Sequence, residues 1–72
     1  MNPYFGVGDL VIDKSFKPYT IGLIHKISVD PKNDKEIIYE LISPYGDMFW
    51  NEAYIIDGII DGKAAVHRRH KN

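Results

Sequence analysis

The sequence predicts an all-β protein, folded as a small five-stranded barrel. Short runs rich in β-branched and aromatic residues recur along the chain. Gly, Pro, Asn and Asp separate these runs roughly every eight to twelve residues, which is typical of small sandwiches and barrels. Before residue 62 we expect no helix of ordinary length. An open sheet of this size would leave its edge strands unpaired, so closure into a barrel is favoured.

The first two strands are expected at residues 9–13 and 20–29. DLVID (9–13) is short, β-branched and preceded by two glycines. KSFKPY (14–19) contains a proline and two aromatic residues, which indicates a loop. TIGLIHKISV (20–29) is rich in Ile, Val and Thr, and Gly22 within it marks a bulge or a close approach of another segment.

A hairpin is expected next, because DPKNDK (30–35) is a polar turn and EIIYELIS (36–43) has the composition of a strand. Side chains alternate across a strand, so Ile37, Tyr39 and Leu41 share one face. The two glutamates of this strand mark the opposite face as outward. The sequence therefore predicts that Tyr39 and Leu41 point into the core.

The last part of the predicted barrel follows a Pro-Gly turn at residues 43–47. MFWN (48–51) reads as a fourth strand, NEAY (51–54) suits a single 3₁₀ turn, and a fifth strand is expected around Ile55–Ile56. IIDG occurs twice in residues 55–62, which is too short for a repeat architecture. Residues 55–60, IIDGII, also contain an Asp-Gly pair between apolar residues, which is a hairpin signal.

The core of so short a chain must be small. A domain of this size buries only about 60% of the surface that its unfolded chain exposes. There is no cysteine, so no disulfide or thiolate metal site can staple the fold. Stability must come from packing, helped by oligomerisation or a partner. The side chains that we expect to be nearly buried are Leu10, Ile21, Leu23, Tyr39, Leu41 and Trp50.

Charge divides the chain into an acidic body and a basic tail. Residues 1–62, the predicted barrel, carry ten acids against five lysines, a net charge of −5. Residues 63–72 carry four basic residues and no acid, a net charge of +4. Val66 is their one large apolar side chain, so burial cannot offset the entropy of ordering them, and a flexible tail is expected. The candidate binding residues of the tail are Lys63, Arg68, Arg69 and Lys71.

Two readings of this tail stay open. It is either a solvated segment that improves solubility, or a segment that contacts phosphates or an acidic protein surface. His67 and His70 have a spacing that could bring both onto one helical face to bind a metal, but we expect no metal site there.

The order of these features resembles that of small SH3-like barrels. GDLV at 8–11, IGLI at 21–24, IYEL at 38–41 and the Gly46–Trp50 spacing match the pattern of a group of short proteins encoded by tailed bacteriophages. The resemblance covers roughly residues 7–60 and implies an SH3-like fold. It also implies a virion-associated protein as the alternative to a cytoplasmic one. SH3-like barrels serve many unrelated roles, so it implies little about function. The chain departs from the pattern by continuing well beyond the last expected strand.

Four aromatic residues form a candidate recognition surface: Phe16, Tyr19, Tyr45 and Trp50. Such a cluster can form a groove for proline-rich peptides or a cage for a methylated amine. The alternative is that the aromatic residues of segment 44–54 fill the core and close one end of the barrel, since aromatic side chains supply much of the buried area in a small domain. The sequence favours packing, with Trp50 the residue most worth testing.

No catalytic or cofactor-binding motif is present in the sequence. Asp30, Asp34 and Glu36 lack the glycine of a calcium loop, and lysines interrupt them. Gly6-Val7-Gly8 lacks the third glycine and the following helix of a nucleotide site. His25 lies in the middle of a strand and is expected at the surface or the rim. We therefore expect neither an enzyme nor a cofactor.

The sequence thus predicts a non-enzymatic protein-interaction or assembly module, which associates with itself or with a protein partner. The alternative is a nucleic-acid-associated barrel that uses the basic tail. The acidic body favours protein, because it would repel phosphates over most of the surface. The N-terminus has no signal-peptide pattern and no apolar run is long enough for a membrane span, so no membrane association is expected.

Overall fold

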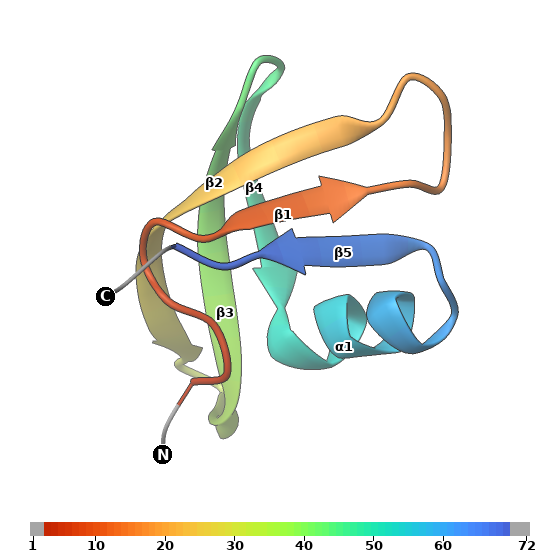
Figure 1. The fold of residues 1–72 in the computed structure, drawn as a ribbon. Coiled ribbons are helices and arrows are strands. Elements are labelled where there is room, and N and C mark those ends of the chain that lie inside the picture. Colours follow the sequence, from red (N-terminus) through yellow and green to blue (C-terminus); the bar gives the residue numbers. More distant parts are fainter. Residues whose placement is uncertain (1–2, 70–72) are drawn as a thin grey trace.

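The computed structural model describes residues 3–69 of the 72, apart from the side chains of residues 33–35. These residues form five strands and one helix (Figure 1). In chain order the elements are β1 (Leu10–Asp13), β2 (Thr20–Asp30), β3 (Asn33–Ser43), β4 (Gly46–Asn51), α1 (Glu52–Ile60) and β5 (Ala64–His67).

The strands form one antiparallel sheet in the order β4-β3-β2-β1-β5. Figure 1 shows β1 and β5 crossing the direction of β3 and β4, with β2 bridging the two groups and α1 beside β5. The prediction of an all-β protein with five strands is confirmed. The predicted closure is not observed, because the edge strands β4 and β5 are not paired with each other in the described chain. α1 connects these two edges and contacts both strands.

Both long hairpins turn on two residues that are held by a side chain. Between β2 and β3, the backbone N–H of Lys32 donates to Asp30 Oδ1 at 2.9 Å. Between β3 and β4, Ser43 Oγ accepts from the Tyr45 N–H at 3.1 Å and donates to the Gly46 carbonyl at 2.8 Å. Gly46 has a φ of 117°, a conformation that favours glycine. The predicted strands β2, β3 and β4 are therefore confirmed, although β3 and β4 both start earlier than expected and the two turns are shorter.

The fifth strand is not where the sequence predicted it, because residues 52–60 are helical. The side chain of Asn51 caps α1 by accepting from the Tyr54 N–H at 2.7 Å, and the acidic Glu52 lies in the first turn. Ile55 is buried, and Asp61-Gly62 ends the helix, with Gly62 at a φ of 77°. The Asp-Gly pairs thus lie within a capped helix and at its end instead of turning a hairpin.

The prediction of a flexible tail from residue 63 is wrong for residues 64–67, which form β5. Strand β5 pairs with β1 along its whole length, and Val66 lies opposite the buried Val11. Beyond β5, the Arg69 N–H donates to the carboxylate of the buried Asp9 at 2.7 Å. The segment has few apolar side chains, but backbone hydrogen bonds to β1 and the packing of Val66 against the core fix it in place.

The core lies on the inner face of the sheet and is completed by one residue of α1 and one from the N-terminal segment. Its buried apolar side chains are Phe5, Val11, Ile24, Ile37, Tyr39, Leu41 and Ile55. The predicted burial of Tyr39 and Leu41 is confirmed. Leu10 and Trp50 are only half-buried.

The predictions for Ile21 and Leu23 are wrong, because both lie on the outer face of the sheet. The cause is Gly22, which faces Leu41: a Cβ built on Gly22 would lie 3.0 Å from the Cβ of Leu41. The inward residues of this half of β2 are therefore Gly22 and Ile24. A bulge at His25 then shifts the alternation, so that Ile27 pairs with the buried Tyr39.

Candidate functional site

A row of apolar side chains crosses the outer face of the sheet, the face opposite the core. In the register, Ile12 lies opposite Ile21, Leu10 lies opposite Leu23, and Leu23 lies opposite Ile42. Directly opposed side chains in an antiparallel pair lie on the same face and in contact distance. These five residues, which we call the outer row, therefore form a continuous strip over β1, β2 and β3.

Three residues of the outer row are substantially open to solvent, and the other two, Leu10 and Ile12, are half-buried. Ile21, Leu23 and Ile42 are 47%, 39% and 45% exposed. Phe49 is exposed as well and lies diagonally from Ile42 on the neighbouring strand β4. Single exposed apolar residues are normal, whereas a contiguous exposed strip marks an interaction surface.

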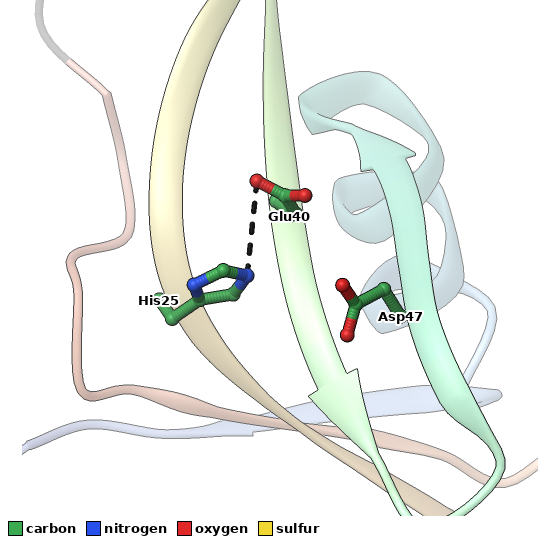
Figure 2. A group of neighbouring side chains, drawn as sticks. All are labelled: His25, Glu40 and Asp47. Atoms are coloured by element: carbon green, nitrogen blue, oxygen red, sulfur yellow. Dashed lines mark ion pairs between the residues drawn. The ribbon is translucent and has the colours of Figure 1, made fainter.

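A polar cluster borders the outer row at its β4 end. His25, Glu40 and Asp47 come from β2, β3 and β4, and Figure 2 shows their side chains converging on one face. His25 Nε2 lies 3.7 Å from Glu40 Oε1, and Asp47 lies opposite Ile42 in the register. The bulge at His25 produces this arrangement, because Lys26 then pairs with Glu40 in the register and His25 comes within reach of the same carboxylate. Together with the outer row, the cluster has the layout of an apolar contact surface with a polar rim.

The same cluster is the one group among the described residues with the donor set of a metal site. Its nitrogen and oxygen ligand atoms lie within 4.8 Å of one another, a mixed donor set that zinc accepts. His25 and Asp47 are exposed and Glu40 is half-buried, so water can solvate all three without an ion. We therefore describe the cluster as a close contact between His25 and Glu40 with a neighbouring carboxylate.

A pocket of about 280 Å³ lies where β4 enters α1. Its apolar wall includes Trp50, the last residue but one of β4, and Tyr54 on the first turn of α1. The two rings are 5.4 Å apart at their centroids and inclined at 54°. Charged side chains also line this pocket, which we call the helix pocket: Asp13, Asp57, Asp61 and Lys63.

Local structure explains how distant residues meet in the helix pocket. The Asn51 cap starts α1 directly after β4, which brings Tyr54 against Trp50. Gly58 lets α1 approach β5, since a Cβ at this position would lie 2.9 Å from the Cβ of Ala64. Ala64 pairs with Asp13, so the end of β1 joins the same pocket.

The structure places the four predicted aromatic residues in different parts of the fold. Trp50 lines the helix pocket together with Tyr54. Phe16 and Tyr19 lie in the loop between β1 and β2, where Phe16 is 82% exposed and Tyr19 lines an open hollow with Lys17 and Pro18. Tyr45 is 79% exposed in the turn between β3 and β4. The helix pocket thus contains one of the four.

The predicted basic residues are likewise dispersed. Lys63 lines the helix pocket beside three carboxylates. The guanidinium carbon of Arg68 lies 5.5 Å from the ring centroid of Phe5, a cation–π contact. The backbone of Arg69 is held by Asp9. Lys71 lies outside the described residues, as does His70.

Sequence reasoning missed Tyr54 and the three carboxylates of the helix pocket because it missed α1. The signal was present: Asn51 followed by Glu52 is a helix start, and the isoleucine pairs at 55–56 and 59–60 recur four residues apart, which suits a helix. It also missed the outer row, because Leu10, Ile21 and Leu23 were all assigned to the core. The signal was Gly22 between Ile21 and Leu23, because a residue without a side chain fits where the strand packs closely against Leu41.

Comparison with known protein families, curated proteins and solved structures finds no match to this chain. Residues 3–69 contain no helix of the length and apolarity that crossing a membrane requires.

Proposed function

We propose that this protein is a non-enzymatic interaction and assembly module of the SH3-like class, which docks through its outer row. Five antiparallel strands in the order β4-β3-β2-β1-β5, with α1 between the two edge strands, support the SH3-like assignment. A place in a phage particle rests on the sequence resemblance alone.

The observation that carries the proposal is the exposure of the outer row. Leu23 lies opposite Ile42 in the register, Ile21 lies two residues from Leu23 on the same face of β2, and all three are more than a third exposed. Removing such apolar surface from water contributes roughly 25 cal/mol per Å². A polar rim that includes Glu40 and Asp47 borders the strip, as expected of a specific contact and not of a random apolar patch.

The occupant that we propose for the outer row is a second copy of this chain. Seven buried apolar side chains form the core of the described residues, few for a domain that has no disulfide. Small domains with limited cores commonly gain stability by oligomerisation. A pair of copies related by a two-fold axis would bury the same row on both sides.

The nucleic-acid alternative has less support. It required a mobile tail with four free cations, but Lys63 lies beside three carboxylates and Arg68 contacts Phe5. Salt-sensitive binding of DNA or RNA by the whole protein would favour this alternative over the proposal.

Sedimentation equilibrium of matched charge variants tests the proposal. Wild type should show a concentration-dependent dimer, and Leu23→Glu should be monomeric at the same concentrations, because a carboxylate in the middle of the row would be buried without a partner. Phe16→Glu introduces the same charge at an exposed aromatic residue of the loop and should leave the dimer intact. A wild-type monomer at all concentrations contradicts the proposal, as does a dimer that Phe16→Glu dissociates and Leu23→Glu does not.

A further inference from the structure

We propose that the helix pocket binds an aliphatic ammonium group, the end of a lysine side chain presented by another protein, in its free or methylated form. This site is separate from the outer row. Its residues lie at the junction of β4, α1, the start of β5 and the end of β1, and none of them belongs to the outer row. The inference goes beyond the proposed function and has its own test.

The aromatic wall of the pocket suits a cation. Trp50 and Tyr54 form a wedge, with ring centroids 5.4 Å apart and planes inclined at 54°. A cation within about 6 Å of a ring centroid is attracted by the negative face of the ring, and tryptophan is the strongest of the aromatic partners. Tyr54 is exposed and Trp50 half-buried, so both rings border a space that is open to a ligand.

The charges around the pocket favour the same ligand. Asp13, Asp57 and Asp61 line it against one cation, Lys63, so three negative charges meet one positive charge, a local excess of −2. Across residues 3–69, the carboxylates of Asp57 and Asp61 engage in neither a hydrogen bond nor an ion pair, whereas Asp13 accepts from the Ser15 N–H at 2.9 Å. Two carboxylates thus remain for an incoming ammonium group.

The size of the pocket limits the ligand to one side chain. Pockets that enclose drug-sized molecules measure roughly 300–1,000 Å³. At about 280 Å³, this one has room for an ammonium head and part of its stem but not for a folded segment. An alkyl stem can lie on the aromatic wall while the charged head faces the carboxylates, as lysine side chains do at other amphipathic surfaces.

The test uses one reporter. The chain has one tryptophan, so the indole N–H of Trp50 gives one resonance in a ¹H–¹⁵N correlation spectrum. The ligands are three blocked tripeptides, glycine–X–glycine, in which X is lysine, trimethyllysine or norleucine. The lysine and trimethyllysine peptides should both shift the indole resonance in a saturable way. The norleucine peptide, which has the stem without the charge, should leave it unchanged.

Matched variants locate the binding. Tyr54→Ala should lower the affinity for the lysine and trimethyllysine peptides about two- to fivefold, the factor expected for one exposed cation–π contact. The double variant Asp57→Asn, Asp61→Asn should lower the affinity for the lysine peptide at least as much. It should also make this affinity less dependent on salt concentration. Tyr45→Ala and Asp47→Asn remove the same groups outside the pocket and should bind as wild type does.

Several outcomes would overturn the inference. The first is that no lysine peptide shifts the indole resonance, and the second is that the norleucine peptide binds equally well. The third is that Asp47→Asn lowers the affinity for the peptides as much as the pocket variants do. The aspartate substitutions are at exposed positions, so we expect each variant to fold. Resonances away from the substituted position should then be unchanged in the same spectrum, which checks that the fold is intact. The Leu23→Glu variant should bind the peptides as wild type does, so failure of self-association and failure of this site are distinguishable.

Discussion

The hydroxyl of Tyr39 donates a hydrogen bond of 2.6 Å to Glu52 Oε2, joining the middle of β3 to the first turn of α1. The same two side chains hold the N-terminal segment, because the Phe5 N–H donates to the Tyr39 hydroxyl and the Tyr4 N–H donates to Glu52. Phe5 packs on the Tyr39 ring with centroids 5.6 Å apart. One buried phenol therefore links the sheet, the helix and the chain before β1.

The first prediction is a loss of stability in alkali that depends on this phenol. Burial, and then the hydrogen bond to Glu52, raise the pKa of Tyr39 from 10.0 to about 12. Because the pKa is higher in the folded state, the stabilisation is complete below pH 10 and is lost as the pH rises toward 12. The loss should be on the order of 2–3 kcal/mol.

Urea unfolding of wild type and Tyr39→Phe between pH 8 and pH 11 checks this prediction. At pH 8 the variant should be less stable by about 1–3 kcal/mol, since Glu52 and the Phe5 N–H each lose a partner. The difference between the two proteins should shrink above pH 10. A constant difference over the whole range would show that the Tyr39 phenol is not the group that titrates.

The second prediction concerns Gly22, which determines which side chains of the first half of β2 face the core. Gly22→Ala would place a Cβ 2.9 Å from Leu41 Cδ2 and 3.0 Å from its Cβ, inside a packed core. We expect a loss of about 1–3 kcal/mol from overpacking. Gly6→Ala is the matched control, because a Cβ at Gly6 meets nothing within 4 Å. Chemical denaturation of both variants decides the point: equal stabilities would mean that Gly22 does not face Leu41.

The third prediction is that the chain needs β5 to fold. A truncation to residues 1–62 removes the whole of β5, leaves β1 as an unpaired edge and takes away Val66, which packs against the core. It should lose cooperative thermal unfolding in circular dichroism. A truncation to residues 1–69, which keeps β5 and the backbone contact of Arg69 with Asp9, should retain it. If the 1–62 chain unfolds at the same temperature as wild type, residues 63–72 are not needed for folding and this prediction is wrong.

The sequence indicated most of the sheet because most of the strands have a simple local signal. In β3 the glutamates and the alternating Ile37, Tyr39 and Leu41 identified the inner face correctly. In β2 apolar residues occur on both faces, so alternation alone could not say which face is buried. The answer depended on the space opposite Gly22, which is a tertiary contact.

The two sites were less accessible to sequence reasoning for related reasons. The helix pocket depends on α1, and the Asp-Gly pairs of segment 55–62 compete as hairpin signals with the Asn51 cap. β5 has too few apolar residues to be predicted from burial, and its order comes from pairing with β1, which lies far away in the sequence. The sequence pointed to Trp50 as the residue to test, and in the structure its ring lies beside that of Tyr54, which the sequence did not single out.

The most direct test of the assembly role is an isotope-filtered NOE spectrum on a mixture of labelled and unlabelled protein. The proposal predicts intermolecular NOEs among the methyl groups of Ile21, Leu23 and Ile42, whose side chains would meet across the two-fold axis. Such contacts at Phe16 and Tyr45 in their place, or no intermolecular contact at a concentration well above that used for sedimentation, would contradict the assignment of the outer row as the docking surface.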